Sequence, residues 1–266
     1  MRIVILPTPS HVAEYAADRV LDVVNGYKNP VLGLATGSTP VELYKVLVTR
    51  YQAELVSFEH VKSFNLDEYI GIDGRHQQSY RYFMNAHLFD HIDINMANTH
   101  VPLADGLDAK ELALSAQLYE NNIKVAGGID LQILGVGING HIGFNEPTSS
   151  FASRTRIKTL SQSTVEANQR FFEADEFQPK LAMTMGIATI LESRSILLMA
   201  TGEQKAKAVK HMIEGPISSM WPGSILQQHA ATTVVLDEAA ASELALKDYY
   251  LWCEKERQSL QQGSFI

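Results

Sequence analysis

Short apolar runs alternate with segments of helical period along almost the whole chain. The apolar runs, each of strand length, are residues 3–6, 31–35, 61–66, 131–134, 195–199 and 232–236. Between them, apolar residues recur every three or four positions, which predicts helices over 10–26, 80–89, 112–125, 204–213 and 239–253, with another opened by Pro40. This alternation predicts a Rossmann-like α/β fold, a doubly wound and mostly parallel sheet with helices on both faces.

The composition is that of one globular domain. The chain has 266 residues, of which 45% are hydrophobic and 20% charged, and these are ordinary values for a globular protein. We find no internal repeat, low-complexity tract or linker. We therefore expect a single domain over residues 1–266, with an irregular insertion or lid around 144–177.

The net charge and the cysteine count limit the classes of function. A net charge of −8 argues against a protein that binds nucleic acid or a membrane surface, because such proteins usually carry a basic face. Cys253 is the one cysteine, which excludes an internal disulfide framework and indicates a reducing compartment. The first apolar run is too short for a secretory signal, and no run approaches the roughly 18–20 apolar residues of a membrane span. We expect a cytoplasmic protein.

Polar residues follow four of the predicted strands, at the point where each strand ends. These segments are TGSTP (36–40), NLDEY (65–69), GVGINGHIGFNEP (135–147) and TGEQK (201–205). In an open parallel sheet, ligands bind beyond the carboxyl ends of the strands. The predicted topology therefore brings glycines, hydroxyl groups, carboxylates, a histidine and a lysine to one edge of the sheet.

The first six residues of the longest of these segments fit G-x-G-x-x-G, the dinucleotide fingerprint, but the residues that follow do not. In a dinucleotide site the glycines open a helix directly, and an acidic residue follows about twenty positions later. Here the sequence continues with His141 and Asn-Glu-Pro (145–147), and the segment 154–158 is basic. We therefore expect no nucleotide cofactor. The glycines give a flexible backbone that presents His141 and Glu146, a pair able to supply acid–base chemistry at neutral pH.

Residues Gly37, Ser38 and Thr39 stand at the start of a predicted helix. Free backbone N–H groups, two hydroxyl groups and the positive end of the helix suit a phosphate group. On this motif alone we favour a capping turn, because Ser and Thr are common N-caps. No Gly-Lys-Ser/Thr follows, so a nucleoside triphosphate site is not expected.

Two further pairs have a spacing that bears on function. Asp67 and Glu68 are adjacent, so in an extended segment their side chains point to opposite sides and only one can face a ligand. The pattern does not say which. His87 and His91 are one helical turn apart, as in some zinc sites, but no third ligand is evident. We interpret them as a helix end and expect no metal.

Four motifs taken together resemble the glucosamine-6-phosphate deaminase family. They are LATGSTP (34–40), FNLDEY (64–69), GHIGFNEP (140–147) and SRTRIKT (153–159). Their order and spacing agree with the family over nearly the whole chain, to about Tyr250. The resemblance implies that glucosamine 6-phosphate and water are converted to fructose 6-phosphate and ammonia, without an organic cofactor or a metal.

The resemblance also implies roles for individual residues. Asp67 would be the base that takes the proton from C2 of the sugar and returns it at C1. His141 would open the sugar ring, supported by Glu146. Asn139 stands where many members carry Asp, so it can accept a hydrogen bond from the imidazole but cannot stabilise the protonated ring by charge. The implied phosphate-binding residues are Gly37, Ser38, Thr39, Arg170 and Lys205.

In the allosteric members of this family, a basic run like 154–159 binds N-acetylglucosamine 6-phosphate at a subunit interface. The residues that match are Ser149, Arg156, Lys158 and Thr159, with Tyr249 or Tyr250 from the last helix. Taken by itself, the run is also typical of a solvated loop or an edge strand. The resemblance implies activation by this sugar phosphate and a homo-oligomer such as a hexamer.

Two other functions remain open from the sequence. A 6-phosphogluconolactonase has a similar fold and a related Gly-His motif, but it lacks the continuation at 144–147 and the stretch 67–69 in this form. A sugar-phosphate sensor that regulates transcription would normally carry a DNA-binding module, and no spare basic segment exists in this chain. The joint presence of Asp67, His141 and Glu146 favours the deaminase.

Overall fold

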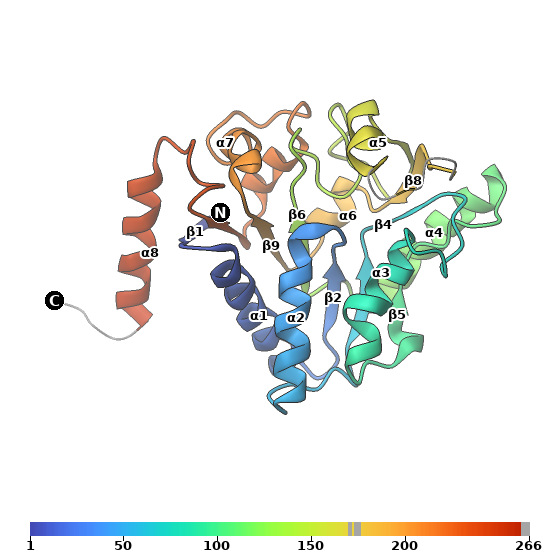
Figure 1. The fold of residues 1–266 in the computed structure, drawn as a ribbon, viewed down its shortest axis with the longest axis horizontal. Coiled ribbons are helices and arrows are strands. Elements are labelled where there is room, and N and C mark those ends of the chain that lie inside the picture. The colour runs from blue at the N-terminus through green and yellow to red at the C-terminus, as the bar shows by residue number, and fades with distance from the viewer. Residues whose placement is uncertain (170–171, 173–176, 262–266) are drawn as a thin grey trace.

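A seven-stranded parallel sheet forms the centre of the protein (Figure 1). The computed structural model describes residues 1–169, 172 and 177–261. The strands, in the order β1-β10-β9-β6-β2-β3-β5, are β1 (Arg2–Leu6), β10 (Thr232–Asp237), β9 (Ser195–Ala200), β6 (Leu131–Gly135), β2 (Val31–Leu34), β3 (Lys62–Asn65) and β5 (Thr99–His100). All neighbours in this order pair in parallel. The middle strands are buried along most of their length, as expected when helices cover both faces of a sheet.

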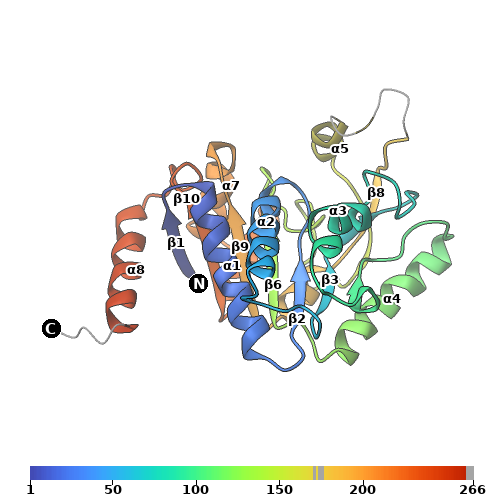
Figure 2. The same cartoon turned by 60° about the horizontal axis from the view of Figure 1, so that its bottom comes forward.

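Helices connect the strands and cover the sheet. They are α1 (Pro9–Gly26), α2 (Ser38–Gln52), α3 (Tyr80–His87), α4 (Ala109–Val125), α5 (Gln162–Gln169), α6 (Ile187–Leu191), α7 (Ala206–Ile213) and α8 (Lys247–Gln261), with short 3-10 helices at Phe89–His91, Met96–Asn98, Glu203–Lys205 and Pro222–Gln228. Figures 1 and 2 show α1, α2 and α3 together on one side of the sheet. Among the described residues, no helix has the length and apolar character that crossing a bilayer requires.

The direction of the chain reverses within the sheet. From β1 to β2, β3 and β5 it moves towards one edge, and from β5 to β6, β9 and β10 it returns towards the other. Because parallel crossovers are right-handed, the two directions place their helices on opposite faces. The predicted doubly wound α/β fold is confirmed. The neighbours β2 and β6 lead to opposite edges, and such a switch point is where ligands bind, beyond the carboxyl ends of the strands.

A second, antiparallel sheet was not predicted from the sequence. It has the order β4-β8-β7, with β4 (Asp67–Tyr69), β8 (Leu181–Thr184) and β7 (Arg156–Thr159). β4 begins two residues after β3 ends, so this small sheet continues from the carboxyl edge of the large one. The segment 144–177, which we expected to be irregular, contains β7 and α5.

The first and last helices begin at other residues than predicted. Thr8 caps α1 instead of Ser10, and its side chain accepts a hydrogen bond from a backbone N–H of the first turn. A proline follows this cap directly, at a position that suits it. The last helix begins at Lys247, well after residue 239, because the Glu214 carboxylate accepts the backbone N–H groups of the two residues before it, at 2.9 Å each.

Candidate active site

Asp67 opens β4 and is buried, with 5% of its surface exposed. Its partner across the small sheet is Thr184, whose hydroxyl group accepts the backbone N–H of Phe144 at 3.1 Å. Burial, together with repulsion from Glu68, raises the pKa of Asp67 to about 8, although a backbone hydrogen bond from Phe144 opposes the shift. A carboxyl group with such a pKa can both take up and release a proton near neutral pH.

The Glu68 carboxylate binds the start of α3. Its carboxylate accepts hydrogen bonds from the Ser79 hydroxyl group (2.8 Å) and from the backbone N–H groups of Tyr80 (2.9 Å) and Arg81 (3.0 Å). A carboxylate at this position stabilises the helix start, where the N–H groups have no partner within the helix. Of the adjacent pair, Glu68 therefore stabilises the start of α3, and Asp67 stays the candidate for proton transfer.

His141 and Glu146 come together in the loop that follows β6. The Nδ1 atom of His141 lies 3.4 Å from Oε2 of Glu146, which is buried. We expected Asn139 to accept a hydrogen bond from the imidazole, but it does not. Its Nδ2 donates to Oε2 of Glu146 (2.8 Å), and its Oδ1 accepts the backbone N–H of His141 (3.2 Å). The carboxylate next to the imidazole therefore comes from Glu146, and Asn139 fixes the loop between them.

Glu146 is held in its ionised form. Burial alone would raise its pKa, but the neighbouring imidazole of His141 and hydrogen bonds from Thr164 and Asn139 outweigh burial and lower the pKa to about 2. The ionised Glu146 faces Nδ1 of the imidazole across 3.4 Å, which leaves Nε2 of His141 for a ligand. Thr164 has no place in any motif that we recognised, so this donor was missed.

Gly137 and Gly143 allow the loop to approach these side chains closely. A Cβ atom on Gly137 would overlap with the imidazole ring of His141. Gly143 has φ of +55°, and a Cβ atom there would lie 3.1 Å from Oγ1 of Thr184 and 3.4 Å from Oδ2 of Asp67. Gly137 of the apparent dinucleotide fingerprint and Gly143 of its continuation thus make room for His141 and Asp67.

A Gly137→Ala variant is expected to lose activity and keep most of its stability. The new methyl group would push the imidazole of His141 away from Glu146, since the ring can move more easily than the backbone. We expect about a hundredfold lower kcat/KM, the size of effect that misplacing an acid–base group produces. Steady-state kinetics and thermal unfolding of Gly135→Ala give the control, because a Cβ atom there meets nothing within 4 Å. Equal activity of the two variants would contradict this account.

The start of α2 lies at the switch point, after β2. Gly37, with φ of 96°, is the N-cap of this 15-residue helix, and no side chain caps it. Gly37 and Ser38 are exposed and Thr39 is half-buried, so the first N–H groups of the helix are open to an anion. Lys205 ends the 3-10 helix that follows β9, at the same edge of the sheet. Arg170 lies outside the described residues.

The residues implied to bind an activator are only partly brought together. Arg156 and Lys158 are two positions apart in β7, so their side chains lie on the same side of the strand. Thr159 is exposed on the other side. Nη1 of Arg156 donates to Oδ1 of Asn145 at 2.9 Å, next to the loop described above. Ser149 is buried in the turn that follows that loop.

The tyrosines of α8 do not join this group within one chain. Figure 1 shows α8 at the opposite end of the molecule from β8, the strand that pairs with β7. The hydroxyl group of Tyr250 lies 3.3 Å from the Glu214 carboxylate, and Tyr249 is exposed. Either tyrosine could contribute to the site of Arg156 only from another copy of the chain.

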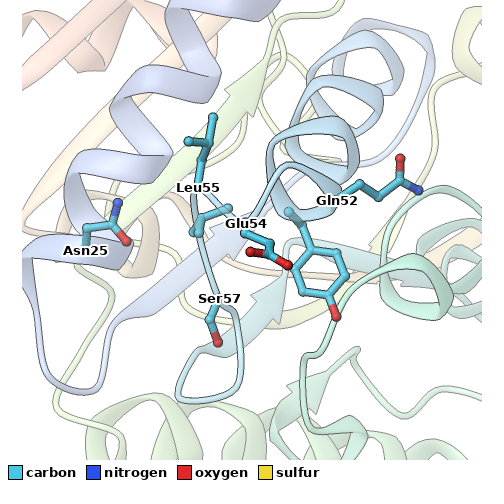
Figure 3. A pocket seen from close by; sticks show the side chains of 7 residues that line it. Asn25, Gln52, Glu54, Leu55 and Ser57 are labelled. Atoms are coloured by element: carbon cyan, nitrogen blue, oxygen red, sulfur yellow. The ribbon is translucent and has the colours of Figure 1, made fainter.

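A surface hollow lies away from these residues (Figure 3). It is lined by Asn25, Tyr51, Gln52, Glu54, Leu55, Val56 and Ser57, around the ends of α1 and α2. Those helix ends precede β2 and β3, so the hollow is at the amino edge of the sheet. None of the candidate catalytic residues lines it.

Known proteins resemble this chain over nearly its full length. Residues 8–235 match the family described as glucosamine-6-phosphate isomerases/6-phosphogluconolactonase. A glucosamine-6-phosphate deaminase of Marinomonas sp. (strain MWYL1) is 68% identical over 99% of both chains. The chain belongs to the glucosamine-6-phosphate deaminase family. A deaminase of Colwellia psychrerythraea is 57% identical over 98% of this chain and 97% of its own.

Solved structures of both a deaminase and a lactonase superpose on this chain, but with different sequence identity. A monomeric glucosamine-6-phosphate deaminase superposes with a TM-score of 0.88 and 41% identity, covering 91% of this chain and all of its own. A 6-phosphogluconolactonase from Trypanosoma cruzi superposes with a TM-score of 0.74 at 18% identity, covering 92% of this chain and 97% of its own. The likeness to the lactonase extends to the fold alone, so the deaminase family is confirmed and the lactonase is a distant relative.

Proposed function

We propose that this chain converts glucosamine 6-phosphate and water to fructose 6-phosphate and ammonia. The observation that carries the proposal is the arrangement of two buried carboxyl groups in opposite states beyond the parallel strands. Asp67 has its pKa raised to about 8, while Glu146 has its pKa lowered to about 2 and faces His141. Such a pair supplies a proton-transfer group and a fixed charge within one site.

The reaction begins with opening of the sugar ring. The imidazole of His141 moves a proton between the C1 hydroxyl group and the ring oxygen, through Nε2, because Nδ1 faces Glu146. The ionised Glu146 stabilises the positive charge that the imidazole carries during this transfer. Asn139 forms hydrogen bonds with both the Glu146 carboxylate and the backbone N–H of His141, and so holds the two residues in position relative to each other.

Asp67 then transfers the proton that defines the isomerisation. Its ionised carboxylate takes the proton from C2 of the open-chain sugar and returns it at C1, through an enediol-type intermediate. Water adds at C2, and the C2–N bond breaks to release ammonia, which leaves fructose 6-phosphate. The substrate's ammonium group beside Asp67 favours the ionised carboxylate, so a base with a raised pKa becomes active when substrate is bound.

The phosphate group fixes the sugar for these transfers. We assign its binding to the start of α2, with Gly37, Ser38 and Thr39, and to the cations of Arg170 and Lys205. Backbone N–H groups and charge-assisted contacts hold phosphate strongly. Holding the far end of the substrate places C1 and C2 next to Asp67, which is where positioning lowers the barrier.

A comparison of substrates tests this function. We expect ammonia and fructose 6-phosphate in equal amounts from glucosamine 6-phosphate, and a much lower kcat/KM for glucosamine, which lacks the phosphate group. Hydrolysis of 6-phosphogluconolactone, with no ammonia from glucosamine 6-phosphate, would overturn the proposal in favour of the lactonase.

N-acetylglucosamine 6-phosphate is proposed as an activator, bound by Ser149, Arg156, Lys158 and Thr159. Arg156 touches Asn145, and Asn145 also donates to the backbone oxygens of Ile142 and Met185, each at 2.9 Å. An anion that draws Arg156 away would therefore act directly on the loop between His141 and Glu146.

An Arg156→Ala variant is expected to lose the response to the activator. Initial rates over a range of substrate concentrations, with and without N-acetylglucosamine 6-phosphate, should then superimpose. Arg75→Ala is the control, because the Arg75 side chain is 91% exposed and pairs with Asp73 at the surface. An activator response in Arg156→Ala equal to that of the unaltered protein would remove Arg156 from this site.

The chain is further proposed to form a homo-oligomer in the cytoplasm. Leu246, Tyr249 and Trp252, on α8 or just before it, are each more than half exposed, and large exposed apolar groups are typical of protein interfaces. A hexamer is the size that the family resemblance favours. A solution mass by light scattering that equals one chain of 29.5 kDa would contradict this proposal.

A further inference from the structure

The Glu146 carboxylate is held from two separate segments of the chain. Its Oε2 atom faces Asn139 and His141, which belong to the same loop. Its Oε1 atom accepts a hydrogen bond from the Thr164 hydroxyl group of α5, at 2.5 Å. Thr164 is 7% exposed, so water competes little for this bond. A helix that follows β7 thus reaches directly to the carboxylate beside the imidazole.

The position of the Thr164 hydroxyl group is itself fixed. Oγ1 of Thr164 lies 2.9 Å from Oγ of Ser161, and the backbone N–H of Thr164 donates to that same Ser161 oxygen at 3.3 Å. The backbone N–H of Ser161 lies 3.5 Å from Oε1 of Glu146. The turn that starts α5 therefore fixes the position of the Thr164 hydroxyl group. Its hydrogen bond to Glu146 does not depend on a freely rotating side chain.

Holding both oxygens of a carboxylate fixes the orientation of its plane, whereas holding one oxygen leaves the plane free to rotate. With Oε1 held by Thr164, rotation about the last bond of the Glu146 side chain is restricted, and Oε2 stays directed at Nδ1 of His141. The bond from Asn139 alone would leave this rotation less restricted, since it reaches Oε2 only.

We propose that Thr164 is a positioning residue, whose hydrogen bond to Oε1 of Glu146 holds the carboxylate plane so that Oε2 orients the imidazole of His141. The proposal rests on the proposed function, because the orientation of His141 matters only if His141 opens the sugar ring. Thr164 acts through Glu146 and touches no reacting atom. A role limited to fastening α5 to the body of the protein is the alternative that an experiment must separate.

Thr164→Val and Thr164→Ser are the informative variants. Valine keeps the shape and removes the donor, and we expect kcat to fall about tenfold with KM within about twofold, the effect of losing one hydrogen bond to a charged group. Serine keeps the donor and should keep most of kcat. In ¹⁵N NMR spectra of the ligand-free protein, Thr164→Val should show the His141 ring as a mixture of tautomers, where the unaltered protein shows one.

Thr189→Val is a matched control. Thr189 donates to a buried carboxylate, Glu120, over the same 2.5 Å, but it belongs to α6, and Glu120 is not one of the candidate catalytic residues. It should lower the melting temperature and leave kcat unchanged. A Thr164→Val variant that behaves like Thr189→Val, or a Thr164→Ser variant as impaired as Thr164→Val, would overturn the proposal.

A double variant separates failure of this proposal from failure of the proposed function. If Thr164 acts through Glu146, Thr164→Val should cause no further loss of kcat in a Glu146→Gln background. The same tenfold loss in that background would overturn the proposal. If the unaltered protein releases no ammonia from glucosamine 6-phosphate, the proposed function fails, and the His141 tautomer in Thr164→Val still decides the role of Thr164.

Discussion

An Asp67→Asn variant is expected to release ammonia from glucosamine 6-phosphate about a thousandfold more slowly than the unaltered protein, because an amide cannot take the proton from C2. Substrate binding should persist, since Gly37, Ser38, Thr39 and Lys205, which are assigned to the phosphate, lie at the start of α2 and after β9, away from β4. Stopped and continuous assays of ammonia give the rate, and calorimetric titration with substrate gives the dissociation constant.

At alkaline pH, Asp67→Asn should be at least as stable as the unaltered protein. The pKa of Asp67 is raised to about 8 in the folded protein, from 3.8 in the unfolded chain. Between these values the folded protein holds a proton that the unfolded chain has lost, so stability falls as the pH rises through this range to about 8. Asparagine never carries the buried charge. Thermal unfolding of Asp67→Asn should therefore depend less on pH, with a melting temperature at pH 8.5 at least equal to that of the unaltered protein.

Asp73→Asn is the matched control for Asp67→Asn. Asp73 lies at the surface and pairs with Arg75, so the change should leave ammonia release as it is. A large loss of stability in Asp67→Asn at every pH would mean that Asp67 supports the small sheet. Full turnover in Asp67→Asn would show that Asp67 does not take part in the reaction.

A His141→Gln variant is expected to lose turnover by about a hundredfold to a thousandfold, because ring opening loses its acid–base group. The step performed by Asp67 should survive. With fructose 6-phosphate and ammonium in D₂O, His141→Gln should still exchange the C1 proton through the open-chain ketose, whereas Asp67→Asn should not. Proton NMR of the sugar follows this exchange.

His60→Gln is the control for His141→Gln, because His60 is exposed and belongs to none of the site loops. It should match the unaltered protein in both turnover and exchange. If His141→Gln loses exchange as completely as Asp67→Asn does, the assignment of separate steps to the two residues is wrong.

The large sheet could be predicted from the sequence because its strands are continuous apolar runs, of which β9 is a clear example. The small sheet could not, although an edge strand was one interpretation of the run 154–159 and β7 is an edge strand of that sheet. β7 reads Arg-Ile-Lys-Thr and places its isoleucine at the surface, and β4 is only three residues long, so neither has a recognisable apolar pattern. Their pairing depends on contacts between residues far apart in the sequence, such as Asp67 with Thr184.

The sequence could indicate candidate site residues to the extent that they follow strand ends. Asp67, His141 and Glu146 became candidates in this way, but the choice between Asp67 and Glu68 depends on where the start of α3 docks, as much as 13 residues later. Thr164 was missed because a threonine in a short polar helix carries no signal of its own, and its role depends on the fold of the β7–α5 segment.

The most direct test of the account uses glucosamine 6-phosphate that carries deuterium at C2. The account predicts that the unaltered protein removes this label from C2, with deuterium at C1 of fructose 6-phosphate or in the solvent, and with one ammonia for each fructose 6-phosphate formed. Asp67→Asn should leave the label in place. Ammonia released while deuterium stays at C2, or no release of ammonia at all, would contradict the claim that Asp67, His141 and Glu146 form an isomerising deaminase site.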